Sequence, residues 1–360
     1  MRCFLRTTAI WAGLAALAGA ATVGFGLFNV SARIGHLPPV HWALHTTFEQ
    51  NVRLRAPSEA EVPANLGDPG LAAIGAGHFD SACRFCHASP GEAQSATALS
   101  MNPAPPHVSD AAASWEPNQL HWIVDNGVKM SGMPHWPTET RDDDVWAVVA
   151  FLDAVPDMGN DDYEAMRNAA AGESIPPVPG LGYCATCHGV DGRAGGNPHM
   201  PRLDIQNEAY LLSALETYRK GTRESGIMHH AARAVDEGML AGLAAHYASQ
   251  TPVGAPAGEG SADGEALASG SDGGDVPSCK ACHGPWPEPR NPAFPEIAGQ
   301  HKAYFESQLR LWRDHARVGN RHAELMALSV KELDDDQIRA LAAYYAALDP
   351  ITQPEPPAGD

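Results

Sequence analysis

An apolar stretch without charged residues runs through residues 7–32, and Arg2 and Arg6 precede it. A helix needs about 20 predominantly apolar residues to cross the hydrocarbon core of a bilayer. Basic residues at one end favour keeping that end in the cytoplasm. The pattern therefore predicts a membrane anchor or signal-anchor within residues 1–35, with the rest of the chain exported. A signal peptide cleaved among residues 16–20 is the alternative, but the apolar run extends past a usual signal core.

Residues 36–64 form a juxtamembrane segment that contains the sequence HWALHTTFEQNVRLR. Its pattern predicts a short amphipathic helix near the membrane surface. His41 and His45 stand four residues apart, a spacing that can bind a metal ion. No third ligand is evident nearby, so an interfacial or solvated pair is the favoured interpretation. The apolar residues expected to face the membrane are Trp42, Leu44 and Phe48.

Helical patterns continue through the rest of the chain. Three acidic residues, Asp142, Asp143 and Asp144, stand before the apolar run of residues 145–152. Negative charge in a first turn is stabilised by the helix macrodipole, so this pattern predicts a helix start. The sequence NEAYLLSALETYRKG predicts a second helix. Near the C-terminal end, Asp334 and Gln337 have the spacing of a capping box.

An internal repeat relates two segments of the chain. PRLDIQNEAYL at residues 201–211 matches PEIAGQHKAYF at residues 295–305. LAGLAAHYAS at residues 240–249 likewise aligns with IRALAAYYAA at residues 338–347. A repeat of this quality implies duplicated domains of one architecture. Residues 252–276, which lie between these duplicated domains and are rich in Gly, Ala, Ser and Asp, show no periodicity. They are expected to form a flexible linker.

Composition and charge narrow the partners of the protein. The chain has 360 residues and a formal net charge of -19. Such an acidic balance argues against binding to nucleic acid and against docking on anionic lipid. It fits a solvated acidic exterior or steering toward a basic partner surface.

The sequence pattern C-x-x-C-H occurs three times. Two thiols one helical turn apart can form thioethers with the two vinyl groups of one porphyrin, and the next imidazole then lies under the iron. A lone pair of cysteines is also consistent with a zinc half-site, a redox dithiol or a disulfide, but a histidine after all three pairs favours covalent haem. We therefore predict three c-type haems, with iron ligands His87, His188 and His283. The thioether cysteines are Cys83, Cys86, Cys184, Cys187, Cys279 and Cys282.

The remaining cysteine, Cys3, precedes the apolar run and is interpreted as an incidental thiol. The three motifs recur at intervals of 101 and 95 residues. Units of this size bury little apolar surface alone, so a tethered macrocycle would supply much of each core. The haem is thus expected to be both a cofactor and a structural centre.

A low-spin electron-transfer haem needs a sixth ligand, and a methionine sulfur gives a higher potential than a second imidazole. In the first unit, Met133 is favoured because Pro134 would fix the loop that presents it. Met130 and Met101 remain alternatives.

The repeat places one methionine seven residues before the segment leading into the last helix of each later unit. Met228 and Met326 occupy this position and are the predicted sixth ligands. The competing ligands are His229, His230 and Met239 in the second unit, and His315 and His322 in the third.

These motifs resemble known families. Residues 175–349 resemble the dihaem cytochromes c4, through CATCHG with PRLDIQ and CKACHG with PEIAGQ. Residues 65–158 resemble a monohaem class I cytochrome c domain, and GVKMSGMPHW is similar to the ligand loop of haem subunits of cbb3-type oxidases. The resemblance implies an all-α fold of three cytochrome c-type domains in tandem after a transmembrane helix, with the first and last helices of each domain crossing.

The resemblance also implies domain limits and partners for the histidine rings. The carbonyls of Pro106, Pro201 and Pro295 are expected to accept the Nδ1 protons of the three proximal histidines. The expected divisions are 1–35 (anchor), 36–64 (juxtamembrane segment), 65–158 (cytochrome c domain 1), 175–251 (domain 2), 252–276 (flexible linker) and 277–349 (domain 3).

The expected function is single-electron transfer on the periplasmic side of a bacterial cytoplasmic membrane. A quinol-oxidising complex or dehydrogenase would be the donor, and a terminal oxidase or reductase the acceptor. Two alternatives are a haem-bearing subunit of a membrane dehydrogenase or oxidase, and a multihaem peroxidase, which would need an open haem with an acid/base pair. The Arg219-Lys220-Arg223 cluster is interpreted as a solvated helix face, or alternatively as a docking patch for an acidic partner.

Overall fold

The computed structural model describes residues 2–172, 174–254, 258–270, 276–285, 291–315, 317 and 321–350. Every regular element within these ranges is helical, which confirms the predicted all-α fold. The α-helices are α1 (Arg2–Gly24), α2 (Pro38–Arg55), α3 (Pro69–Ala82), α4 (Arg84–His87), α5 (Ala96–Leu99), α6 (Val108–Ser114), α7 (Pro117–Asn126), α8 (Asp142–Ala154), α9 (Asn160–Arg167), α10 (Leu181–His188), α11 (Glu208–Lys220), α12 (Gly226–Ala234), α13 (Leu240–Ala248), α14 (Ala262–Ser269), α15 (Lys280–His283), α16 (Lys302–Arg313), α17 (Arg321–Val330) and α18 (Asp335–Ala346). Short 3-10 turns lie at Glu59–Glu61, Val155–Asp157, Ala194–Gly196 and Glu237–Met239.

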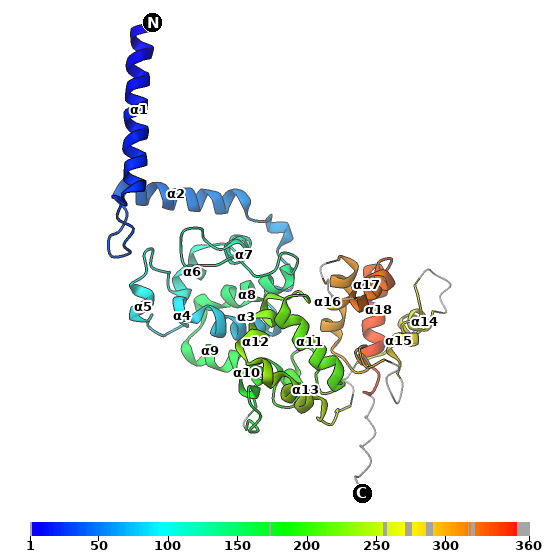
Figure 1. Ribbon diagram of the computed structural model, residues 1–360. Helices are drawn as coiled ribbons and strands as arrows, with labels where there is room; N and C mark the ends of the chain where they lie inside the picture. Colours follow the sequence, from blue (N-terminus) through cyan, green and yellow to red (C-terminus); the bar gives the residue numbers. More distant parts are fainter. Residues whose placement is uncertain are drawn as a thin grey trace.

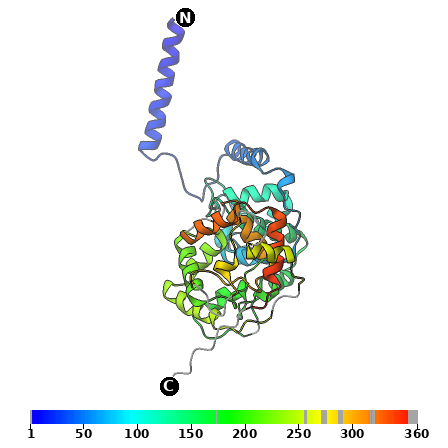
Figure 2. The same cartoon turned by 90° about the vertical axis from the view of Figure 1, so that its right-hand side faces the viewer.

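Helix α1 stands apart from the globular part of the molecule, and α2 lies across its base (Figure 1). Figure 2 shows the same separation after a quarter turn. The C-terminal half of α2 packs on the first unit through buried Val52 and through Phe48, whose ring lies 5.7 Å from that of Trp115. The N-terminal half of α2 is exposed.

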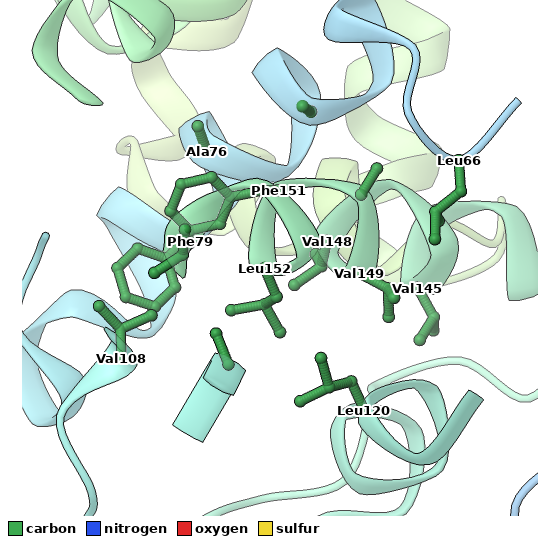
Figure 3. Close-up of a cluster of buried hydrophobic side chains, with 14 of the residues drawn as sticks. Leu66, Ala76, Phe79, Val108, Leu120, Val145, Val148, Val149, Phe151 and Leu152 are labelled. Atoms are coloured by element: carbon green, nitrogen blue, oxygen red, sulfur yellow. The ribbon is translucent and has the colours of Figure 1, made fainter. Parts of the chain in front are cut away.

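The first unit is built on a close crossing of α3 and α8. A Cβ atom at Gly75 would lie 2.1 Å from the Ala147 carbonyl oxygen, so only glycine allows the two backbones to approach this closely. Phe79 of α3 and Phe151 of α8 pack beside the crossing with ring centroids 5.0 Å apart (Figure 3). Buried Tyr163 of α9 joins the same core, so this unit extends past the predicted limit at residue 158.

The third unit repeats this crossing with α14 and α18. A Cβ atom at Gly264 would lie 2.1 Å from the Ala340 carbonyl oxygen. Leu267 and Ala268 of α14 are buried in the core that α18 lines. The prediction of a flexible linker over residues 252–276 is therefore wrong for residues 262–269, because packing against α18 stabilises a helix too short to stand alone.

The second unit has a smaller core around Leu181 of α10 and Leu243, Ala244 and Tyr247 of α13. It is joined to the third unit by a reciprocal pair of glutamines from the repeat. The Gln206 side chain donates to the Glu296 carbonyl at 2.7 Å and accepts from the Glu296 amide at 3.1 Å.

Gln300 makes the equivalent bonds in the opposite direction. Its side chain donates to the Arg202 carbonyl at 3.2 Å and accepts from the Arg202 amide at 2.8 Å. Arg202 and Glu296 occupy the same position of the repeat, directly after Pro201 and Pro295. The two units therefore meet through the same surface with pseudo-two-fold symmetry.

Candidate functional site

A cavity of about 540 Å³ lies where the three units meet, and most of its lining residues belong to the second and third units. Both C-terminal C-x-x-C-H motifs open into it, and so do both of the methionines that the repeat selected. The predicted residues that the structure brings together here are Cys184, Cys187, His188, Met228, Cys279, Cys282, His283 and Met326.

None of the six motif cysteines forms a disulfide among the described residues. Burial raises the pKa of Cys83 to about 12, and the pKa values of Cys184, Cys187 and Cys279 to about 11. Thiols held in the protonated form are poor nucleophiles, because the thiolate is the reactive species. This environment disfavours a redox dithiol.

Two of the three motif histidines have the expected ring partner. His87 Nδ1 lies 2.8 Å from the Pro106 carbonyl oxygen, and His283 Nδ1 lies 3.0 Å from that of Pro295. Such a bond orients the ring and leaves Nε2 free for a metal. His188 differs from the expectation, because its buried Nδ1 has no hydrogen-bond partner among the described residues, Pro201 included.

Burial lowers the pKa of all three motif histidines, and lowers that of His188 to about 4. A neutral imidazole is the form that binds a metal ion. The rings are therefore ready to act as ligands at neutral pH.

In the second unit, the competing side chains on α12 are directed elsewhere. His229 Nδ1 lies 2.8 Å from the Tyr218 carbonyl oxygen, and the His230 ring lies 5.5 Å from the His78 ring of the first unit. Of these residues, only Met228 lines the cavity. In the third unit both Met326 and His322 line it, whereas His315 is exposed.

The loop after α7 carries the methionines of the first unit. Met130 is 93% exposed with a positive φ of 65°, whereas Met133 is half-buried. The Met133 carbonyl accepts a 3.2 Å hydrogen bond from the Val128 amide. Met101 also reaches this loop, since its terminal carbon lies 2.5 Å from the place of a Cβ at Gly132. Burial thus favours Met133 over Met130 and leaves Met101 as an alternative.

Comparison with known proteins identifies the family. Residues 70–152 match the family described as cytochrome c oxidase, cbb3-type, subunit III. The chain is 34% identical over 197 residues to cytochrome c4 of Azotobacter vinelandii, which covers 51% of this chain and 90% of that protein. The chain belongs to the class I c-type cytochromes.

A further relative agrees with this family. The thiosulfate dehydrogenase electron acceptor of Thiomonas intermedia (strain K12) is 33% identical over 174 residues, covering 47% of this chain and 80% of that protein. The crystal structure of reduced cytochrome c4 from Pseudomonas stutzeri is 28% identical with a TM-score of 0.42, covering 49% of this chain and all of that one. As a c-type cytochrome, the chain binds haem covalently and transfers electrons without being a catalyst itself.

Two arginines that line the cavity of this cytochrome, half-buried Arg223 and buried Arg317, were not recognised as cavity residues from the sequence. The Arg223 guanidinium stacks on Tyr218 at 4.4 Å, and Arg317 stacks on Trp312 at 4.3 Å. Arg223 therefore does not belong to a surface docking patch. The Arg219 guanidinium donates hydrogen bonds to the carbonyls of Ala232 and Val235, each at 2.8 Å. The repeat register, which also aligns Arg223 with Arg317, was the signal that could have found this pair.

These arginines test whether haem fits the cavity. Within the described residues neither guanidinium has a carboxylate partner, and the Nε atom of each is buried without a hydrogen bond. A buried positive charge is costly unless an anion compensates it. Haem carries two propionate carboxylates, so the donor set and the paired arginines fit haem. Bound haem iron supplies reversible one-electron chemistry.

Proposed function

We propose that the chain is a membrane-tethered electron carrier with three covalent haems on the periplasmic side of a bacterial cytoplasmic membrane. It would pass single electrons from a quinol-oxidising complex or dehydrogenase to a terminal oxidase or reductase. The observation that carries the proposal is one cavity that is lined by two sets of predicted cysteine, histidine and methionine ligands. Filled axial positions favour electron transfer over substrate turnover, because no open site remains on the iron.

The third haem is assigned to the first unit on its own residues. Cys83, Cys86 and His87 complete the motif, and the His87 ring is oriented by Pro106 as the His283 ring is by Pro295. Met133 is the proposed sixth ligand there, alongside Met228 and Met326 in the later units.

Membrane attachment is supported by two helices. Among the described helices, only α1 has the length and composition to cross a bilayer, over Phe4–Gly24 with a mean hydropathy of 1.4. Below it, α2 presents an unpacked apolar stripe with helical spacing at Leu37, Val40, Leu44 and Leu54, each at least 44% exposed. Such a stripe beside an anchor suits the interface of the same membrane.

Mass spectrometry of the purified full-length protein tests the haem count. We expect the polypeptide mass plus three haems, and no carbon monoxide binding by the reduced protein, since carbon monoxide requires an open ferrous iron. A smaller haem count, or carbon monoxide at all three irons, would refute the proposal.

The methionine ligands are tested by Met133→His, Met228→His and Met326→His in separate chains. Each exchange should lower the midpoint potential of one haem, because imidazole stabilises ferric iron more than a thioether does. Met130→His is the matched control for the first unit, since Met130 is exposed. Three unchanged midpoints in the test variants would contradict the ligand assignment.

A second candidate is an electron-accepting subunit of a larger enzyme. It is favoured by the relatives, one of which is a thiosulfate dehydrogenase electron acceptor. Gentle detergent extraction followed by size-exclusion chromatography separates the two candidates. A catalytic partner that remains at a fixed ratio would support the subunit, whereas a monodisperse cytochrome would support the carrier.

A further inference from the structure

The helix that carries Met228 begins at the contact between the first and second units. This helix, α12, is capped by Ser225, whose hydroxyl oxygen accepts from the Met228 amide at 3.1 Å. The same hydroxyl donates to Asp144 of the first unit at 2.8 Å. The first amides of a helix have no partner within it, so Ser225 caps α12 and Asp144 holds the capping hydroxyl from a different unit.

Arg141 holds Asp144 in this position. Its guanidinium donates to Asp144 at 2.8 Å and to the carbonyl of Glu224 at 2.7 Å. Both Arg141 and Asp144 are only 7% exposed. Glu224 directly precedes the capping serine, so one buried guanidinium links the start of α8 to the start of α12.

An aromatic contact joins the two methionine-bearing segments directly. Trp136 follows Met133 by three residues, is 6% exposed and belongs to the core of the first unit. A Cβ atom at Gly226 would lie 2.3 Å from Nε1 and Cε2 of its indole, so the ring rests against the bare backbone. Ile227, the residue before Met228, packs against the same core.

We propose that Asp144 and Trp136 of the first unit are positioning residues that hold Met228 in place as the sixth ligand of the second haem. This inference rests on the proposed function, because it needs Met228 to be an iron ligand. Helix α12 has nine residues, too few to be stable without packing. The first unit therefore holds the capping hydroxyl and supplies the wall that fix it, and ligation in the second unit depends on docking of the first.

Carbon monoxide binding to the full-length, haem-loaded protein tests this role, with haem content and far-UV circular dichroism as checks on folding. In Trp136→Ala and Ser225→Ala, we expect reduced protein to bind carbon monoxide at one haem per chain, against none in the parent. One midpoint potential should shift and two should not. Trp136→Phe keeps a ring against Gly226 and should restore the parent behaviour.

Ser261→Ala is the matched control. Ser261 caps α14 by accepting from the Gly264 amide at 3.0 Å, within the third unit. The Ser261→Ala variant loses a helix cap comparable to that of Ser225, but it should leave the sixth ligand in place at every haem. An open haem in this control would attribute the effect to general loosening and overturn the proposal.

A Met228→His background identifies the haem that responds. If Trp136 acts through Met228, the stronger imidazole ligand should abolish carbon monoxide binding in the Trp136→Ala, Met228→His chain. Persistent binding would place the effect at Met133 and overturn the inference, as would three unchanged midpoints in Trp136→Ala and Ser225→Ala. A parent protein with fewer than three haems, or with open haems, would instead refute the proposed function.

Discussion

The second unit is attached to its two neighbours in different ways. Its contact with the third unit uses the same surface on both sides. Gln206 and Gln300 each form hydrogen bonds with backbone groups of the other unit. Its contact with the first unit is asymmetric and depends on the buried ions Arg141 and Asp144. An internal repeat can close on itself through one self-complementary patch, whereas an unrelated domain needs a separate set of contacts.

The difference has an energetic consequence. Neutral hydrogen bonds to backbone groups lose little when one bond fails, because each contributes only about 0.5–1.5 kcal/mol. Buried charges are costly to leave without a partner. Removal of Arg141 should therefore cost more than removal of either glutamine.

Arg141→Met should have the largest effect. It removes the partner of Asp143 and Asp144 and should destabilise docking of the first unit by about 3–5 kcal/mol. The loss of stability is measured by denaturant titration of the haem-loaded chain. Haem absorbance and the rate of proteolytic cleavage after residue 167 serve as the two readouts. Arg84→Met, at a more exposed ion pair, is the control and should cost less than about 1 kcal/mol.

The stability of the Arg141→Met variant should also depend on pH. Burial raises the pKa of Asp144 to about 6 from its ordinary value near 3.8. The folded state then binds a proton more readily than the unfolded state, so the stability of the variant should rise as the pH falls from 7 toward 4. Stability that is equal at pH 7 and pH 5 would contradict the burial of this carboxyl.

Gln206→Ala and Gln300→Ala test the symmetric contact between the second and third units. Each variant leaves one backbone amide and one carbonyl of the opposite unit without a partner, at a cost of about 1–3 kcal/mol. Pseudo-two-fold symmetry predicts similar losses from the two variants in denaturant titrations. Gln250→Ala, which removes a bond within the second unit, is the control. If the stability losses of the two glutamine variants differ severalfold, the two hydrogen-bond pairs are alike in geometry but contribute unequally to stability.

Glu296→Gln should show the smallest effect and marks where the symmetry ends. Arg202 pairs with buried Asp204, whereas its counterpart Glu296 is 9% exposed and has no basic partner in the described part of the chain. Burial raises the pKa of Glu296 to about 7 from 4.5. Stability of the parent should therefore fall as the pH rises from 4.5 to 7, by on the order of 1 kcal/mol, and the variant should lose this slope. An unchanged slope would exclude Glu296 as its source.

Two expectations from the sequence about the surroundings of particular residues were wrong. Residues 262–269 have too short a pattern to indicate a helix, and their order comes from Gly264 packing against α18. Arg223 stands in a charged cluster that is typical of a solvated surface, yet it lines the cavity and stacks on Tyr218. Both errors arise because burial depends on what another segment of the chain covers.

Local chemistry explains what the sequence determined by itself. Thioether attachment and proximal ligation use neighbouring residues within one helical turn, so the three motifs specify cofactor type and position without knowledge of the fold. The repeat register adds Met228 and Met326 as predicted sixth ligands, because duplicated domains keep the same order of parts. Long-range contacts decided the rest: the shared cavity, the paired arginines and the hydrogen bond by which Asp144 holds the cap of α12. These join residues at least 80 positions apart or from different units, and only packing of the folded chain brings such groups together.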